Sequence, residues 1–68
     1  MLTLVVNGQP RHIERPMTIL EFLQTLGVNL TIVAVGYNGE VLERQAWATT
    51  LLRDGDTLEI VRPVGGGR

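Results

Sequence analysis

A single amphipathic segment constrains the fold of this chain most strongly. Between positions 18 and 26, apolar residues recur at i, i+3, i+4 and i+7, which gathers their side chains on one face of a helix. These residues are Ile19, Phe22, Leu23 and Leu26. Thr18 and Glu21 have the spacing of a capping box, and Gly27 suits the left-handed position that ends many helices. The sequence therefore predicts one helix over residues 18–26.

The rest of the chain has the pattern of strands joined by tight turns. Runs rich in apolar and β-branched residues predict strands over residues 1–6, 9–13, 32–37, 41–42 and 57–62. Asn7-Gly8 and Asn38-Gly39 are typical of two-residue hairpin turns, because both central residues of such turns need positive φ. Residues 53–56, with the sequence Arg-Asp-Gly-Asp, are typical of a tight turn.

Three segments carry more specific expectations. The run Ile-Val-Ala-Val predicts that the strand over residues 32–37 is buried on both faces. Residues 43–50 are expected to form a turn of helix or an irregular crossover. In the last strand we expect Leu58 and Ile60 on one face and the residues between them on the other, because side chains alternate along a strand.

These elements indicate an α+β fold. A lone helix must bury its apolar stripe, and the only partner available is a sheet. We therefore expect the β-grasp (ubiquitin-like) arrangement: one mixed four- to five-stranded sheet packed on a single helix, with the first and last strands paired in parallel at the centre. Residues 1–63 are assigned to this domain, and residues 64–68 to a flexible glycine-rich tail.

Composition excludes several classes of function. The formal net charge is −1, which argues against a protein that binds a nucleic-acid backbone. The chain has no Cys, Ser or Lys, which excludes a thiolate nucleophile, a cysteine-based zinc site and a serine triad. No apolar run approaches the ~20 residues of a membrane span, and no signal peptide is recognisable. We therefore expect a soluble, cytoplasmic domain that has no membrane partner.

The residues that commonly carry chemistry have simpler explanations here. His12 is the one histidine, and its position on a predicted strand favours a surface role. Asp54 and Asp56 flank a glycine, a spacing more typical of a turn than of an acid/base pair or a calcium loop. We expect no catalytic residue and no metal site.

The C-terminus is the remaining chemical handle. Gly65, Gly66 and Gly67 lie beside the chain end, where they have no evident packing role. The alternative to a functional tail is a frayed end without function. Residues 63–68 reach about 20 Å when extended, and glycines fit a narrow channel because they lack Cβ. Ordering such a tail costs about 1–2 kcal/mol per residue. A partner that accepts the tail must therefore also contact the folded body.

Motifs along nearly the whole chain occur in a recognisable order. They are Val6-Asn7-Gly8, Thr18-Ile19-x-x-Phe22-Leu23, Ala34-Val35-x-x-Asn38, Val41-Leu42-x-Arg44-x-x-Trp47-Ala48, Asp54-Gly55-Asp56, Leu58-Glu59-Ile60-Val61 and the glycine tail. In this order they resemble the sulfur carrier proteins of thiamine biosynthesis (ThiS-like), in the ubiquitin-like β-grasp superfamily. The chain departs from that family at Glu43, where proline is common, and at Arg68, which follows the usual terminal diglycine.

The resemblance implies a carrier that other enzymes act on. An E1-like adenylyltransferase (ThiF-type) uses ATP and Mg²⁺ to adenylate the carboxylate of Gly67, with Gly65 and Gly66 as the flexible lead. A cysteine desulfurase supplies sulfur, and the resulting thiocarboxylate donates it to thiazole synthase (ThiG-type). Arg68 must then be removed first; whether it is a natural residue or a cloning remnant stays open. No cofactor is permanently bound.

The folded body is expected to dock through one sheet face and the base of the tail. The partner-binding candidates are Val5, Val61, Arg62 and Val64. Trp47 is expected to anchor a satellite core. Arg44 is expected to bridge to a carboxylate or to backbone carbonyls.

Other functions share this fold. Within the carrier class, the alternatives are the small subunit of molybdopterin synthase (MoaD-like) and a carrier for tRNA thiolation. From another class, a TGS-type β-grasp module binds RNA, but such modules have a basic surface and belong to larger chains. The slightly acidic composition ranks this module lower, so no nucleic-acid partner is expected.

Overall fold

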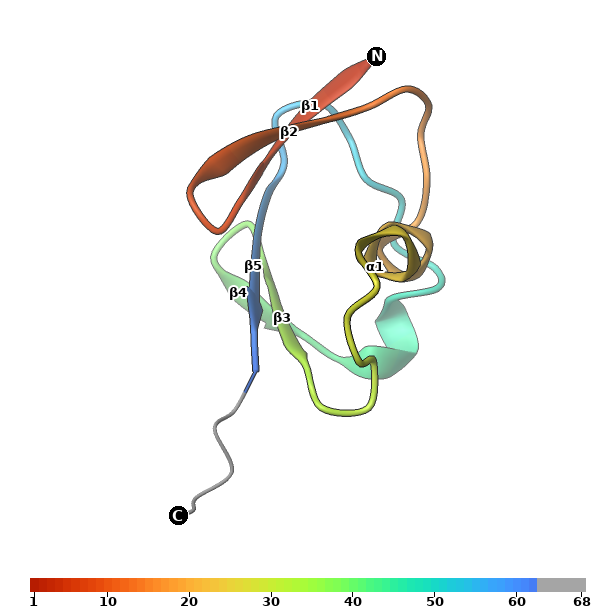
Figure 1. The fold of residues 1–68 in the computed structure, drawn as a ribbon, viewed down its shortest axis with the longest axis vertical. Helices are drawn as coiled ribbons and strands as arrows, with labels where there is room; N and C mark the ends of the chain where they lie inside the picture. The colour runs from red at the N-terminus through yellow and green to blue at the C-terminus, as the bar shows by residue number, and fades with distance from the viewer. Residues whose placement is uncertain (63–68) are drawn as a thin grey trace.

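The computed structural model describes residues 1–62, which form a five-stranded mixed sheet crossed by one helix (Figure 1). The elements are β1 (Leu2–Val6), β2 (Gln9–Ile13), α1 (Ile19–Leu26), β3 (Ala34–Tyr37), β4 (Glu40–Leu42), the 3-10 turn η1 (Arg44–Ala46) and β5 (Thr57–Val61). The strand order is β2-β1-β5-β3-β4. The predicted α+β, β-grasp architecture is confirmed.

β5 holds the two halves of the sheet together. It pairs with β1 in parallel, through Val5 with Thr57 and Val6 with Leu58. On its other side it pairs with β3 in antiparallel register, from Tyr37 with Leu58 to Ala34 with Val61. The first and last strands therefore pair in parallel at the centre, as predicted.

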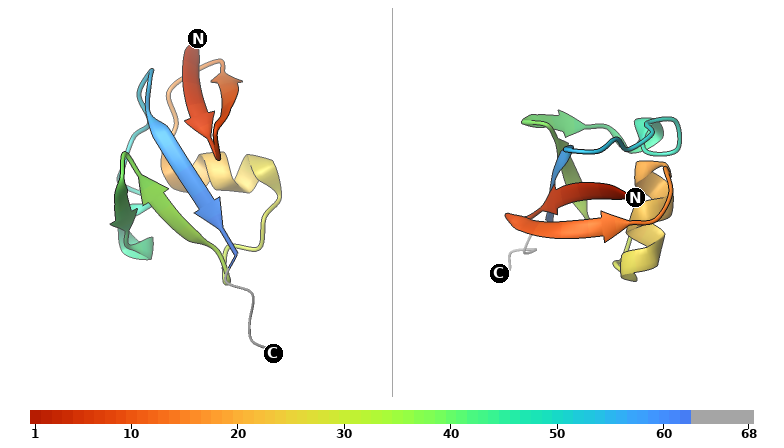
Figure 2. Two further views of the ribbon diagram at one scale, coloured as in Figure 1. Left: turned by 90° about the vertical axis from the view of Figure 1, so that its left-hand side faces the viewer. Right: turned by 90° about the horizontal axis from the view of Figure 1, so that it is seen from above.

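α1 covers one face of this sheet (Figure 2). The predicted capping box is present: the N–H of Thr18 donates to Glu21 Oε1 at 2.9 Å, and the N–H of Glu21 donates to Thr18 Oγ1 at 3.1 Å. Gly27 ends the helix with a φ of 73°. The buried side chains of the stripe contribute about 1.5–3 kcal/mol each. The helix has eight residues, and in the described chain no helix is long and apolar enough to cross a membrane.

The core lies between α1 and the inward face of the sheet. Its buried apolar residues are Leu4, Val6, Ile13, Ile19, Phe22, Leu23, Val33, Val35, Trp47, Leu52 and Leu58. Both predicted hairpin turns form, with Asn7 at a φ of 52° and Asn38 at 50°. The turn over residues 53–56 also forms, since the N–H of Asp56 donates to the Arg53 carbonyl at 3.1 Å.

The prediction for residues 32–37 is wrong in one respect. β3 begins only at Ala34, and Ile32 is 45% exposed. Ile32 belongs to a turn closed by its N–H bond to the Asn29 carbonyl, and this turn directs its side chain outward. Within β3, Val35 faces α1, whereas Ala34 and Gly36 lie on the opposite, open face of the sheet. This strand is therefore buried on one face only.

Candidate functional site: the exit strand and the surfaces beside it

β5 is the strand from which the chain continues toward its C-terminus. Leu58 is fully buried and Ile60 is half-buried on the same side, whereas Glu59 and Val61 are exposed. This is the alternation that the sequence predicts. Arg62, which follows directly, is exposed and is the last residue described. The predicted site residues Val64, Gly65, Gly66 and Gly67 and the predicted tail, residues 64–68, lie outside the described residues.

Two asparagine side chains hold the backbone of β5 from opposite sides. The carboxamide of Asn7 donates to the Ile60 carbonyl at 3.1 Å and accepts from the Ile60 N–H at 2.7 Å. Asn38 Oδ1 accepts from the Thr57 N–H at 2.9 Å. Each asparagine lies in a left-handed turn position, which leaves its side chain beside the neighbouring strand. The strand that leads to the C-terminus is therefore fixed near both its ends.

A buried carboxylate fixes the start of the same strand. Asp56 is only 8% exposed. It accepts hydrogen bonds from the Tyr37 hydroxyl at 2.6 Å, the Arg53 N–H at 2.8 Å and Asn38 Nδ2 at 3.3 Å. Burial alone raises the pKa of Asp56, but these hydrogen bonds and the positive charge of Arg53 outweigh it and lower that pKa. The hydrogen bond to Asp56 is the main reason that the pKa of Tyr37 is raised.

The described partner-binding candidates lie on or beside the open face of the sheet. Val5 is 37% and Val61 is 55% exposed, and both point away from α1. They do not form one contact, because Val5 pairs with Thr57, four residues before Val61 on β5. Four residues of strand span about 13 Å. On the open face, Val5 of β1 and Val61 of β5 are therefore separate apolar positions, and Val61 lies beside Arg62.

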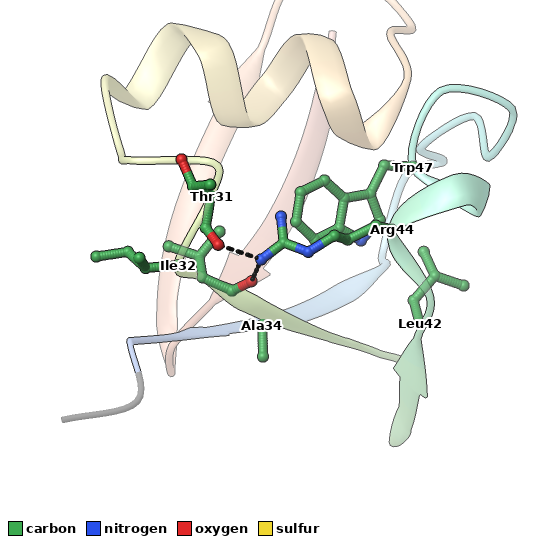
Figure 3. A pocket seen from close by; sticks show the side chains of 7 residues that line it. Thr31, Ile32, Ala34, Leu42, Arg44 and Trp47 are labelled. Atoms are coloured by element: carbon green, nitrogen blue, oxygen red, sulfur yellow. Dashed lines mark hydrogen bonds between the residues drawn. The ribbon is translucent and has the colours of Figure 1, made fainter. Parts of the chain in front are cut away.

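The Arg44–Trp47 segment forms an internal brace instead of a reactive site (Figure 3). The guanidinium of Arg44 donates to the carbonyls of Leu30, of Thr31 at 2.7 Å and of Val33 at 3.2 Å. It also lies 5.0 Å from the centroid of the Trp47 ring, at cation–π distance. This confirms that Arg44 bridges to backbone carbonyls. Trp47 belongs to the main core and not, as predicted, to a satellite core.

The brace tolerates the absence of proline before Arg44. Glu43 precedes η1 with a φ of −70°, which is close to the value that proline fixes.

A hollow of about 410 Å³ lies beside Arg44 and Trp47. It is lined mainly by apolar side chains, and no Asp or Glu of the described chain lines it. The hollow offers no acid or base.

The remaining candidates have structural roles. Nδ1 of His12 lies 3.1 Å from Thr3 Oγ1 on the exposed side of the β1–β2 hairpin. Asp54 Oδ1 accepts from the Thr3 N–H at 2.7 Å, so Asp54 ties the turn to β1. Within residues 1–62, no three His, Cys, Asp or Glu side chains come close enough to hold a metal ion.

Sequence reasoning misses three residues that position β5. The Asn-Gly patterns at Asn7 and Asn38 indicate turns alone, although an asparagine in such a turn has a carboxamide free to bond a neighbouring strand. Asp56 likewise lies in a pattern that indicates only a turn. Its partner Tyr37 lies 19 residues away, a pairing that only the β3–β5 register creates.

The model of the ThiS family matches residues 4–67, which is nearly the whole chain. This chain belongs to the ThiS family. The resemblance drawn from the sequence motifs is thereby confirmed.

Individual relatives agree with the ThiS assignment. The chain is 40% identical over 62 residues to the sulfur carrier protein ThiS of Thermus thermophilus, covering 91% of this chain and 95% of that protein. A crystal structure of the thiamine biosynthesis protein ThiS from Geobacter metallireducens superimposes with a TM-score of 0.87. The two chains are 39% identical, and the match covers 97% of this chain and 100% of that one.

ThiS-like sequence also occurs in longer proteins. The chain is 41% identical over 66 residues to a thiazole synthase of Paramagnetospirillum magneticum. The match covers 97% of this chain but 20% of that protein. The chain therefore spans about a fifth of the length of that thiazole synthase.

Proposed function

We propose that this protein carries sulfur for thiamine biosynthesis as a thiocarboxylate on Gly67, and that it is a substrate of other enzymes. The observation that carries the proposal is the ThiS family match, which extends to Gly67 and leaves out Arg68. The ThiS relative of Thermus thermophilus is named a sulfur carrier. The composition supports a terminal handle, because the chain has no Cys on which to carry a persulfide.

The proposed loading has three steps at the Gly67 carboxyl group. A carboxylate oxygen first attacks the α-phosphorus of ATP on an E1-like, ThiF-type adenylyltransferase that uses Mg²⁺, and pyrophosphate leaves. The terminal sulfur of a cysteine desulfurase persulfide then attacks the acyl carbon and displaces AMP. A thiol finally attacks the desulfurase sulfur of the acyl disulfide, which releases the thiocarboxylate and leaves a disulfide between the thiol and the desulfurase cysteine.

The proposed acceptor is a ThiG-type thiazole synthase, which incorporates the sulfur into the thiazole ring. The similarity to one stretch of a thiazole synthase supports this partner, because there a ThiS-like sequence and the synthase belong to one chain. The carrier's own contribution is to present its terminus. The hydrogen bonds of Asn7, Asn38 and Asp56 hold β5 in a fixed direction, and Arg62 follows it.

Intact-protein mass spectrometry tests the proposal. The chain ending at Gly67 and the chain ending at Arg68 are each incubated with adenylyltransferase, ATP, Mg²⁺, desulfurase, cysteine and a thiol. We expect only the chain ending at Gly67 to gain the mass of one sulfur in exchange for one oxygen. No gain in either chain would contradict the carrier proposal, and direct loading of the longer chain would contradict the assignment to Gly67.

A further inference from the structure

A second hollow lies on the opposite side of β5 from the open sheet face. It measures about 360 Å³ and opens between the β1–β2 hairpin, the end of α1 and the end of β5. Its apolar lining consists of Val6, Leu26, Val28, Val33 and Ile60. The polar residues that line it include Gln9, Arg11 and Arg62. We call this hollow the arginine groove.

Strand alternation explains why both arginines reach one groove. On β2, Arg11 pairs with the buried Leu4, so it lies on the inward side of an edge strand. Arg62 directly follows β5 and comes two residues after Ile60, so it has the same parity as Ile60. The edge strand β2 and the end of the central strand β5 thus place Arg11 and Arg62 at the same apolar hollow.

The charge of this groove is unbalanced. Arg11 and Arg62 are both exposed, and no Asp or Glu of residues 1–62 lines the groove with them. Like charges beside a low-dielectric floor repel, and an anion between them removes that repulsion. A guanidinium is well suited to bind a carboxylate with two parallel hydrogen bonds. The apolar floor provides a place for an apolar side chain next to that carboxylate.

We propose that the arginine groove docks an acidic segment, a carboxylate beside an apolar side chain, on the adenylyltransferase that takes the C-terminal tail. This inference rests on the proposed function. Arg62 lies two residues before the predicted tail, so an adenylyltransferase that binds the tail lies against the groove as well as against Val61. Such a partner would contact both sides of β5, and these contacts would offset the free-energy cost of ordering the tail.

Charge reversal tests the groove directly. Arg11→Glu, Arg62→Glu and the control Arg15→Glu, an exposed residue that does not line the groove, are made in the chain ending at Gly67. Binding to the adenylyltransferase is measured by calorimetry at two salt concentrations. We expect each groove variant to bind about tenfold more weakly and with a reduced salt dependence, while the control binds normally. Equal affinities for all three variants would overturn the proposal.

Two further measurements distinguish docking from other roles of the arginines. One other role for Arg11, an inward-facing charge on an edge strand, is to block edge-to-edge pairing with another chain. In that case Arg11→Gln self-associates and binds the partner normally, whereas docking predicts weaker binding by a monomer. Amide chemical shifts of the groove are also followed during titration with inorganic phosphate and with ATP alone. Saturable binding of either at the groove would overturn the assignment to a protein carboxylate.

The sulfur-loading assay separates failure of this inference from failure of the proposed function. If the unmodified carrier gains sulfur but the groove variants bind normally, only the groove proposal fails. If the unmodified carrier never gains sulfur, the proposed function fails.

Discussion

Asn7 extends the pairing of β5 beyond the point at which β1 ends. β1 pairs with β5 only as far as Val6 with Leu58, and the chain then turns back at Asn7. The Asn7 carboxamide nevertheless bonds both the N–H and the carbonyl of Ile60, as a neighbouring strand would. A turn residue thus holds the last part of β5, upstream of the glycines that the proposed chemistry requires.

Replacing Asn7 with glycine is expected to loosen the end of β5. Glycine keeps the left-handed backbone of the turn but removes two hydrogen bonds, at a cost of about 1–3 kcal/mol. Hydrogen exchange at the Ile60 N–H should accelerate strongly, which NMR measures residue by residue. Asn7→Asp is the comparison, because it keeps an acceptor for that N–H but faces the Ile60 carbonyl with an oxygen. Unchanged protection of Ile60 in Asn7→Gly would count against the role of Asn7.

Stability should depend on pH at both ends of the range through the Asp56–Tyr37 pair. The pKa of Asp56 is below its ordinary 3.8, so its contribution is present above that pH and is lost as the pH falls through the lower, folded value. The pKa of Tyr37 is above its ordinary 10.0, so its contribution is complete below that pH and declines as the pH rises.

Two variants separate these effects in urea unfolding at acidic, neutral and alkaline pH. Asp56→Asn should flatten the acid side, and Tyr37→Phe should flatten the alkaline side. Glu14→Gln removes an exposed carboxylate and serves as the control. If Asp56→Asn keeps the full acid dependence of the unmodified protein, other carboxylates are responsible and the prediction is wrong.

Arg44→Lys should destabilise the protein by about 1–3 kcal/mol although the charge is kept. Lysine has no planar fork with which to reach the three carbonyls of residues 30–33 that Arg44 bonds, nor does it stack as well on Trp47. Chemical denaturation gives the free energy of unfolding. Arg15→Lys at an exposed position is the matched control. A loss no larger than that of the control would show that the brace contributes little.

Val61→Glu should weaken binding to the adenylyltransferase by about tenfold or more, because it places a charge on the exposed apolar position nearest the end of β5. Leu51→Glu makes a similar change at a side chain of similar exposure, 52% compared with 55%, outside the sheet and paired with Thr18 at the start of α1. Calorimetry compares the two. Equal loss in both variants would indicate a general effect of charge and not a docking contact at Val61.

Removing residues 66–68 should leave the unfolding midpoint nearly unchanged and abolish sulfur loading. The reason is that residues 1–62 already form a core, whose buried apolar side chains run from Leu4 to Leu58. Circular dichroism gives the midpoint, and mass spectrometry gives the loading. A sharply lower midpoint would assign these residues a structural role.

Local chemistry made much of the fold predictable. The capping box of Thr18 and Glu21, the left-handed Gly27 and the two Asn-Gly turns are all short-range signals, and each formed as expected. The single sheet was predictable because one amphipathic helix needs a sheet to cover its apolar stripe.

Long-range geometry was less accessible from sequence. The burial of Asp56 depends on the strand register that brings Tyr37 beside it. The exposure of Ile32 depends on a turn that the sequence does not indicate, because the apolar residues around Ile32 have the pattern of a strand. The arginine groove unites residues 51 positions apart, Arg11 and Arg62, through two separate strand pairings. For the candidate site, sequence identified exposed apolar positions on the correct strands, but not the side chains that hold β5 in place.

Because β5 lies at the centre of the sheet, the sheet can form only in a chain that includes β5. Without β5, the β1–β2 and β3–β4 hairpins have no strand in common. A ribosome synthesises β5 after the other four described strands, so a chain terminated before β5 cannot close its sheet. Such a fragment would remain open to proteases. Under the proposed function, the adenylyltransferase would therefore encounter few carriers truncated before β5, because only chains translated through β5 would persist in the folded state.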